Sequence, residues 1–216
     1  MKTKRAVIFA NGKMVDWDAA ADLIHADDLL IAADGGAKVA GKLGFTPQVL
    51  IGDLDSLPAR EVKRLEDGGT RVIRYPVEKD ETDLELALDF ALGEGAGEIL
   101  ILASFGGRLD QTLGNLSLLN REDLRGVQVR MDDGRDELTL IHSKAWIHGS
   151  AGDIISLIPL GGEAGGVTTR GLQFPLEKET LYPQKTRGIS NRMTGVSAAI
   201  GLETGALICI HTRQGR

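Results

Sequence analysis

The 216-residue sequence has a single cysteine, Cys209, and no apolar run near the ~20 residues that a membrane-spanning helix requires. One cysteine excludes an intrachain disulfide framework and fits a reducing compartment. The basic first residues precede an apolar run that ends at Asn11, which is too short for a secretory signal sequence. We therefore expect a cytoplasmic protein with no membrane partner.

Basic residues are in the minority, with 25 Lys and Arg against 31 Asp and Glu, so the formal net charge is −6. Nucleic-acid-binding proteins normally carry a basic surface, so this balance argues against a nucleic-acid partner. The sequence also has no Walker A motif, no dinucleotide-binding G-x-G-x-x-G turn and no G-x-S-x-G elbow. Its four histidines lack ligand spacing, which argues against zinc.

The first part of the chain alternates short apolar runs with helix-like segments, which is typical of parallel βαβ units. Strands are expected at residues 6–10, 29–33, 47–51, 71–75, 98–103 and 127–131. Helices are expected at residues 18–25, 38–43, 58–66, 84–91 and 110–119. Right-handed crossovers would place these helices on both faces of one parallel sheet.

The pattern changes after residue 136, where short β-rich runs separated by glycine turns replace the alternation. These runs cover residues 138–141, 145–147, 154–158, 167–169, 196–200 and 207–212. We therefore predict two domains, an α/β domain over residues 1–136 and a small all-β domain over residues 137–216. Barrel and sandwich are both open for the second domain at this point.

Aspartates recur just after four of the expected strands. The four blocks are Asp34-Gly35-Gly36, Gly52-Asp53-Leu54-Asp55-Ser56, Lys79-Asp80-Glu81-Thr82-Asp83 and Gly106-Gly107-Arg108-Leu109-Asp110. The carboxyl ends of parallel strands meet at one sheet edge, which is where open α/β sheets hold their ligands. Clustered carboxylates there suit a hard cation such as Mg²⁺, which usually accompanies phosphate.

Each block alone also has a structural interpretation. Asp55 or Ser56 could cap the helix at residues 58–66, Thr82 is a natural cap, and Asp110 opens another helix. Independent caps do not explain why the acids follow consecutive strands, so the sequence favours a metal–nucleotide site. Arg108 offers a planar fork for phosphate, and the Gly-Gly turn after Asp34 suits an anion or a ribose.

In this order the four blocks resemble the signature segments of the thiamine pyrophosphokinase family. Residues 170–176 and 188–191 resemble its substrate-binding segments, so the resemblance spans nearly the whole chain. It implies an α/β catalytic domain that binds nucleotide and Mg²⁺, followed by a β-sandwich domain for thiamine binding and dimerisation. It further implies a homodimer with active sites between subunits and the reaction ATP + thiamine → AMP + thiamine diphosphate.

The resemblance also implies roles for individual residues. Asp53, Asp55 and Asp83 would hold the metal. Catalytic positioning of the ATP phosphates and the acceptor hydroxyl would fall to Asp80, Asp83, Arg108 and Asp110. Nucleotide contacts would come from Asp34, Gly35, Gly36, Gly106, Gly107 and Arg108. Thiamine contacts would come from Phe174, Ser190 and Asn191, supplied by the partner subunit.

Two positions depart from the family pattern. Gln111 stands where histidine is frequent, and Phe174 stands where an aromatic residue, frequently tryptophan, stacks near thiamine. Two other functions are kept as alternatives: another Mg-ATP-dependent phosphotransferase with a different alcohol or a pterin as acceptor, and a non-catalytic module that binds a nucleotide or thiamine. The β domain could also serve only as a dimerisation platform.

Overall fold

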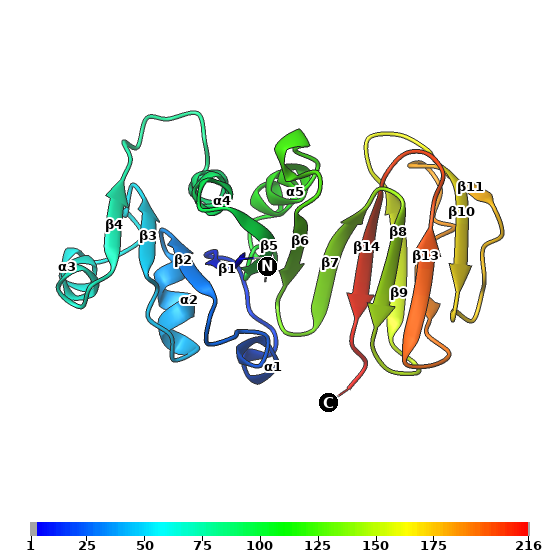
Figure 1. Ribbon diagram of the computed structural model, residues 1–216, viewed down its shortest axis with the longest axis horizontal. Helices are drawn as coiled ribbons and strands as arrows, with labels where there is room; N and C mark the ends of the chain where they lie inside the picture. The colour runs from blue at the N-terminus through cyan, green and yellow to red at the C-terminus, as the bar shows by residue number, and fades with distance from the viewer. Residues whose placement is uncertain (1–3, 216) are drawn as a thin grey trace. The chain divides into compact units, whose positions relative to one another are not determined.

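The computed structural model describes residues 4–215, and the chain divides into two compact units, of which the first ends at Gly134 and the second begins at Arg135. Figure 1 shows that the described helices all belong to the first unit, whereas the second is built of strands. No helix among the described residues is both long enough and apolar enough to span a membrane.

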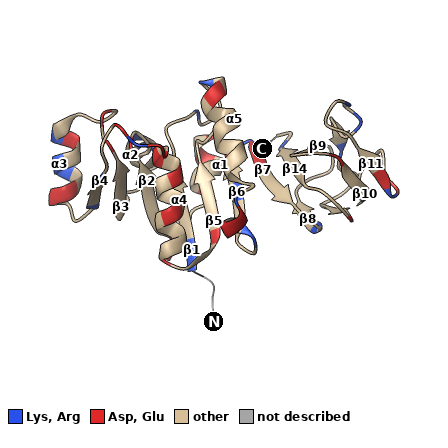
Figure 2. Cartoon of the chain, turned by 90° about the horizontal axis from the view of Figure 1, so that it is seen from above, with Lys and Arg blue, Asp and Glu red and all other residues tan. Residues whose placement is uncertain are grey.

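The first unit alternates strands and helices as the sequence predicts. Its strands are β1 Lys4–Phe9, β2 Leu29–Ala33, β3 Val49–Gly52, β4 Arg71–Arg74, β5 Ala96–Leu102 and β6 Gln128–Asp132. Its helices are α1 Trp17–Ala21, α2 Gly36–Lys42, α3 Ala59–Asp67, α4 Asp83–Gly93, α5 Leu109–Leu118 and the short 3-10 helix η1 Glu122–Leu124. In Figure 2, α3 contains both acidic and basic residues, as expected for a helix with one face in solvent.

All strands of the first unit pair in parallel, in the order β6-β5-β1-β2-β3-β4. Strand β1 lies between β2 and β5, so the chain builds the sheet outward from β1 first on one side and then on the other. This makes the carboxyl ends of β1 and β5 the topological switch point of the sheet. Open α/β sheets bind their ligands at such a point.

Both faces of this sheet are covered by helices. Val7 and Phe9 of β1 pack in one cluster with Ala20 of α1 and Val39 of α2. The alternate residue, Ile8, is fully buried as well, and α4 packs against β1, β2, β3 and β5. Because a parallel sheet covered on both faces needs apolar side chains in both directions, its strands read as continuous apolar runs.

The first helix is shorter than its predicted range of residues 18–25. Asp16 caps α1 by accepting a hydrogen bond from the backbone N–H of Ala19. Beyond Ala21 the backbone finds partners outside a helix: the Leu23 carbonyl accepts from Arg5 and the His25 N–H donates to Asp28. These bonds, one to Arg5 and one within a local turn, replace regular helical hydrogen bonds, and α1 ends early.

The second unit is a β-sandwich of two antiparallel sheets, which resolves the choice between barrel and sandwich. Its strands are β7 Asp136–Ile141, β8 Lys144–His148, β9 Ile154–Pro159, β10 Ala164–Arg170, β11 Glu179–Leu181, β12 Asn191–Arg192, β13 Ser197–Gly201 and β14 Leu207–Thr212. The sheet orders within the unit are β12-β9-β14-β7 and β11-β10-β13-β8. The short strands β11 and β12 are absent from the sequence prediction.

The sandwich core is formed by residues from both sheets. Leu157 and Cys209 of one sheet share a buried cluster with Val167 and Ile200 of the other. Cys209 is a free thiol whose pKa is raised to about 12 by burial and by the nearby charge of Glu137. It is therefore a packing residue, as its apolar neighbours in the sequence suggest.

Candidate active site

Three aspartates meet at the carboxyl edge of the parallel sheet. Asp34 follows β2, Asp53 follows β3 and Asp83 begins α4, and carboxylate oxygens of the three lie within 4.8 Å of one another. Asp34 is only 6% exposed, and its Oδ1 has no hydrogen-bond partner. A buried carboxylate oxygen costs free energy unless a cation or a donor compensates it. These three residues therefore form the best candidate cation site in the described chain.

Unusual backbone conformations bring these acids together. Asp34 has a positive φ of 43°, which turns the chain sharply at the end of β2. Gly52 has φ 145°, and a Cβ atom there would lie 3.0 Å from Cγ of Asp83 and 3.1 Å from Cβ of Asp34. Only glycine leaves room for the acids at this point. Such strained conformations are often found at functional sites.

Lys79 lies beside the three acids. Its Nζ is 3.1 Å from Oδ1 of Asp83 and 3.7 Å from Oδ2 of Asp53. Burial opposes the charged ammonium, but the hydrogen bond and charge of Asp83, with the charge of Asp53, outweigh it and raise the pKa of Lys79. Burial also raises the pKa of Asp83, an effect that Lys79 opposes and the charges of Asp53 and Asp34 reinforce.

The acids of the four blocks are not helix caps. Helix α4 is capped by Thr82, whose side chain accepts from the Glu85 N–H, so the Asp83 carboxylate is left for the site. Helices α2, α3 and α5 have no side-chain cap hydrogen bond at their described first turns. The capping interpretation is therefore correct for Thr82 and wrong for Asp55, Ser56 and Asp110.

A pocket of about 730 Å³ opens above the acids. All four blocks predicted from the sequence contribute to its wall, through Asp34, Asp53, Asp55, Asp83, Gly106, Gly107 and Arg108. This volume lies in the range of ~300–1,000 Å³ that is usual for small-molecule sites. The wall combines carboxylates with the cations Lys13, Lys79 and Arg108, which suits a metal together with a polyanionic ligand.

Some predicted site residues lie away from the three acids. Asp55 lines the pocket but is exposed and is not part of the close group. Asp80 is exposed and does not line the pocket. Asp110 pairs with Arg108 at 2.5 Å and lines a smaller neighbouring pocket of about 270 Å³. The hydrogen bond with Arg108 and one from the Gln111 N–H lower the pKa of Asp110.

Gly35 and Gly36 are buried behind the pocket rather than on its wall. A Cβ atom at Gly36 would lie 1.8 Å from the carbonyl oxygen of Phe9. This glycine therefore allows α2 to approach β1 closely, which is a packing role.

The sequence prediction omitted several residues of the pocket wall. Asn11 and Lys13 follow β1, and Ser104 follows β5 next to the topological switch point. The Ser104 carbonyl accepts from Asn115 of α5 at 2.6 Å, whereas the buried Ser104 hydroxyl has no partner. The same rule that selected the acids, polar residues directly after a strand, would have found Asn11 and Ser104.

The three predicted acceptor-binding residues lie together in the second unit. Phe174 is 57% exposed, and the side-chain amide of Asn191 bonds to the Phe174 backbone through both its oxygen and its nitrogen, at 3.0 and 2.6 Å. Ser190 has a positive φ of 60°, and its N–H donates to the Ser156 hydroxyl. The segment thus presents an aromatic ring on a hydrogen-bonded turn.

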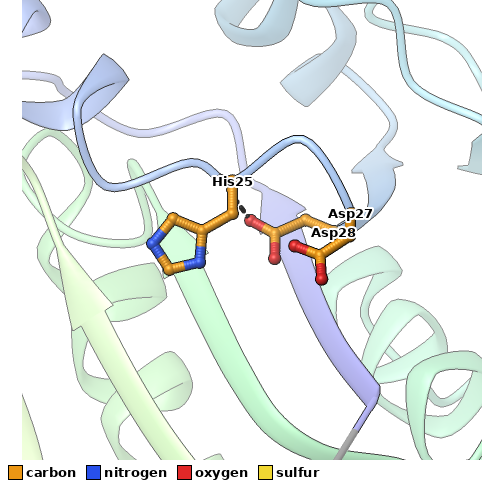
Figure 3. A group of neighbouring side chains, drawn as sticks. All are labelled: His25, Asp27 and Asp28. Carbon is orange, nitrogen blue, oxygen red and sulfur yellow. Dashed lines mark hydrogen bonds between the residues drawn. The ribbon is translucent and has the colours of Figure 1, made fainter. Parts of the chain in front are cut away.

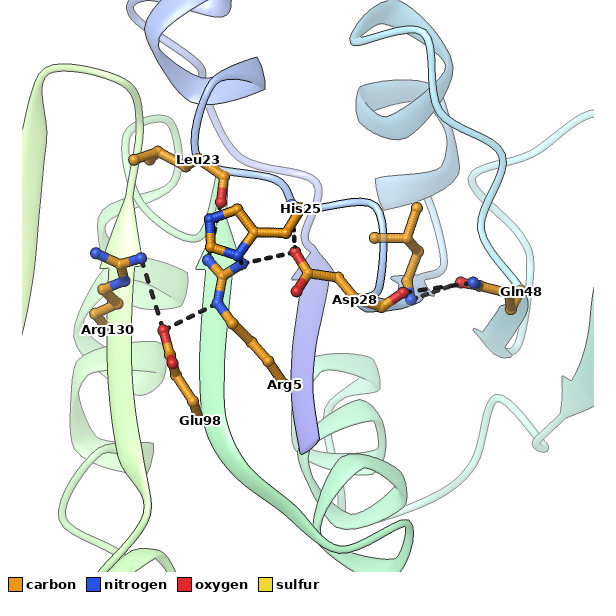
Figure 4. A network of polar contacts seen from close by, with 8 residues as sticks. Arg5, Leu23, His25, Asp28, Gln48, Glu98 and Arg130 are labelled. Carbon is orange, nitrogen blue, oxygen red and sulfur yellow. Dashed lines mark hydrogen bonds and ion pairs between the residues drawn. The ribbon is translucent and has the colours of Figure 1, made fainter. Parts of the chain in front are cut away.

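A second group of titratable residues lies in the first unit. His25, Asp27 and Asp28 lie close together, as Figure 3 shows, but only Asp28 is buried. In Figure 4, Arg5 donates to Asp28 at 2.7 Å, to Glu98 at 2.9 Å and to a backbone carbonyl. Because the Arg5 guanidinium already provides the positive charge beside Asp28, we interpret Arg5, Asp28 and Glu98 as a partly buried structural ion-pair network at the amino ends of the strands.

Each of the two units matches a model of a known protein family. Residues 20–131 match the model described as thiamin pyrophosphokinase, catalytic domain, and residues 141–209 match thiamin pyrophosphokinase, vitamin B1 binding domain. The chain belongs to the thiamine pyrophosphokinase family. The first match contains the three acids, and the second contains Phe174, Ser190 and Asn191.

Members of the thiamine pyrophosphokinase family resemble the chain over most of its length. The thiamine pyrophosphokinase of Bacillus subtilis is 30% identical over 192 residues, which are 85% of this chain and 87% of that protein. A crystal structure from Bacillus subtilis has a TM-score of 0.87 at 27% identity and covers 98% of this chain and 100% of that one. A structure from Geobacillus thermodenitrificans has a TM-score of 0.80 at 25% identity, with 98% of each chain covered.

Proposed function

We propose that this protein transfers the pyrophosphoryl group of ATP to the hydroxyethyl oxygen of thiamine, giving thiamine diphosphate and AMP. The observation that carries this proposal is the close group of Asp34, Asp53 and Asp83 at the floor of a pocket lined by cations, in a chain that matches both family models. The other functions considered, a different phosphotransferase or a non-catalytic binding module, are not favoured by these matches.

The donor set fits Mg²⁺. Carboxylate oxygens are its usual protein ligands, and the buried Asp34 Oδ1 without a partner is a ligand atom that such a cation would satisfy. We propose that Asp34, Asp53 and Asp83 hold it, and Asp55 on the same pocket wall stays a predicted ligand. Bound Mg²⁺ would supply neutralisation of the phosphate charge.

The residues of the chain would bind and orient the two substrates. Lys13 and Arg108 line the pocket and are placed to pair with phosphate oxygens. In the reaction a bond forms between the thiamine oxygen and the β-phosphorus, and the bond from that phosphorus to the oxygen of AMP breaks. The hydroxyl proton passes to a carboxylate, for which Asp83 and Asp110 are the candidates. Asp80 and Asp110 stay candidates for orienting that hydroxyl. Phosphoryl transfers of this kind depend mainly on positioning and charge neutralisation.

Phe174 is proposed as the surface on which thiamine stacks, because its ring is exposed and held on a hydrogen-bonded turn. A phenyl ring can replace the larger indole in stacking. Ser190 and Asn191 support this turn. Thiamine is a cation, so a protein with net charge −6 suits it as an acceptor better than an anionic alcohol.

We further propose a homodimer in which a second copy supplies the acceptor-binding residues of each site. Trp146, Phe174, Ile189 and Val196 expose large apolar side chains on the second unit. Exposed apolar side chains of this kind are common where proteins bind partners. The use of ATP and the single buried thiol of Cys209 fit a cytoplasmic enzyme.

The proposed activity is tested by incubating the protein with ATP, Mg²⁺ and thiamine and measuring AMP. AMP should form only when thiamine is present. Asp53→Asn should abolish AMP formation while thiamine still binds, as measured by calorimetry. Formation of ADP, or AMP formation that ignores thiamine, would refute the proposed reaction.

A further inference from the structure

Lys79 is the inward-facing member of an otherwise exposed loop. Residues 75–82 connect β4 to α4, and in this loop the Lys79 side chain is only 10% exposed while its neighbours lie open to solvent. The loop therefore holds one ammonium group against the acids. It does so at an entropic cost, because a long lysine side chain loses rotamer freedom when it is fixed.

The ammonium of Lys79 engages the oxygens that a metal would use. It lies 3.1 Å from Asp83 and 3.7 Å from Asp53, two of the three residues in the close group. The third, Asp34, keeps a buried oxygen without a partner that points to a further ligand of the site. One ammonium leaves two of three carboxylate charges uncompensated, so the site still attracts a divalent cation.

We propose that Lys79 is a built-in competitor of the divalent cation and couples its binding to that of the nucleotide. Without nucleotide, the ammonium pairs with Asp83 and lies close to Asp53, and it weakens binding of a free cation. When a nucleotide enters, its phosphate oxygens offer Lys79 a new partner, and the carboxylates become available to the cation. This inference rests on the metal site of the proposed function.

The physical basis is repulsion between two cations that share the same carboxylates. At 3–4 Å from the same oxygens, an ammonium and a divalent cation would lie within a few ångströms of each other, where their repulsion is strong. The ammonium must therefore move when the cation binds. A phosphate chain in the same pocket is a suitable destination, since Lys79 lines that pocket.

An ordinary structural ion pair is the alternative. In that case removing the ammonium would loosen the β4–α4 loop and weaken cation binding or leave it unchanged. Only the competitor role predicts tighter binding of a free cation when the ammonium is removed, which makes the affinity for a free cation the decisive measurement. Turnover alone would not separate them, because both predict a less active variant.

The experiment measures Mn²⁺ binding by electron paramagnetic resonance, with and without a non-hydrolysable ATP analogue. Wild type should bind free Mn²⁺ weakly and bind it much more tightly with the analogue. Lys79→Met should bind free Mn²⁺ about tenfold more tightly than wild type, which is a typical size for coupling between two binding sites. Adding the analogue should increase the Mn²⁺ affinity of Lys79→Met only slightly. Lys79→Arg, which keeps the charge, should behave like wild type.

Lys63→Met is the matched control, because Lys63 pairs with Asp67 on the exposed surface of α3, outside the pocket. It should leave Mn²⁺ binding unchanged. If Lys79→Met does not fold, Lys79→Gln is measured in its place, and its melting temperature should rise more with Mn²⁺ than that of wild type.

Two failures are distinguishable. If Lys79→Met, or Lys79→Gln in its place, binds free Mn²⁺ no more tightly than wild type, Lys79 is not a competitor of the cation. Wild type that binds no Mn²⁺ even with the analogue would instead contradict the metal site of the proposed function, and with it this inference.

Discussion

The side-chain amide of Asn191 bonds to the backbone of Phe174 in both directions. Its Oδ1 accepts from the Phe174 N–H at 3.0 Å, and its Nδ2 donates to the Phe174 carbonyl at 2.6 Å. The same Oδ1 also accepts from the Arg192 N–H. With its amide used in this way, Asn191 holds the backbone at the exposed Phe174, and we expect it to affect the acceptor through the Phe174 ring.

We therefore expect the effects of Asn191→Ala and Phe174→Ala to be non-additive. Each should raise the thiamine KM by about tenfold, or about 1.4 kcal/mol, with a small change in kcat, because stacking on an aromatic ring is lost. The double variant should be no worse than Phe174→Ala. Steady-state kinetics with all three variants checks this, and additive effects would indicate that Asn191 contacts thiamine directly.

Asp34→Asn should raise the stability of the protein and lower its activity. Removing a buried carboxylate that has an unpartnered oxygen should stabilise the metal-free protein by about 1 kcal/mol, since active sites commonly keep unfavourable groups for function. The same change should reduce kcat/KM by at least about a hundredfold, or roughly 2.7 kcal/mol of transition-state stabilisation. Urea unfolding and activity assays measure the two effects, with Asp55→Asn as the comparison at an exposed acid. Full activity in Asp34→Asn would remove Asp34 from the site.

Subunit complementation tests the shared active site. Asp53→Asn and Phe174→Ala each damage one half of the site. At low thiamine the Asp53→Asn homodimer should be inactive and the Phe174→Ala homodimer weakly active. Mixed dimers would contain one intact site if the halves come from different copies, which restores about a quarter of wild-type activity in a random mixture. Co-expression of the two variants measures this. No recovery, in dimers verified by mass, would mean that each copy builds its own site.

Asp153 gives the sandwich a pH-dependent component of stability. Burial alone would raise its pKa, but hydrogen bonds from the Gln214 N–H, from His211 and from the Ser150 N–H outweigh burial and lower the pKa of Asp153. A carboxylate with a lowered folded-state pKa stabilises the protein above its ordinary pKa of ~3.9 and loses that contribution as the pH falls further. Its ionised form is the stabilising one.

Asp153→Asn should accordingly lower the free energy of unfolding by about 2–3 kcal/mol at pH 7, as expected for a buried hydrogen-bonded carboxylate. The difference from wild type should shrink as the pH drops below about 4. Urea unfolding at several pH values checks this. A difference that stays constant down to acidic pH would show that the charge of Asp153 contributes nothing.

The sequence predicts the position of the site at the edge of the sheet better than it predicts the roles of the individual site residues. The rule that ligands lie after parallel strands places Asp34, Asp53 and Asp83 at one edge, because it depends only on chain direction. It does not say which carboxylates converge, since that depends on backbone angles such as the positive φ of Asp34 and of Gly52. The sequence therefore predicts Asp34 as a nucleotide contact, whereas the structure places its carboxylate close to those of Asp53 and Asp83.

The conformation of the loop before α4 is the second feature that the sequence does not predict. Lys79, Asp80 and Asp83 are close in sequence, yet Lys79 and Asp83 turn inward while Asp80 lies in solvent. Only the path of residues 75–82 decides this, and no periodicity encodes it. The short strand β12 could not be predicted for a similar reason. Its two residues pair with β9, and local sequence does not specify this tertiary pairing.

We propose that a pyrophosphoryl group, rather than a single phosphoryl group, moves to thiamine at the acidic edge of the sheet. ATP labelled with ³²P at the β-phosphate tests it most directly, in the presence of Mg²⁺ and thiamine. The label should appear in thiamine diphosphate, with unlabelled AMP formed in equal amount. Labelled ADP together with unlabelled thiamine monophosphate, or label that never reaches thiamine, would contradict the account.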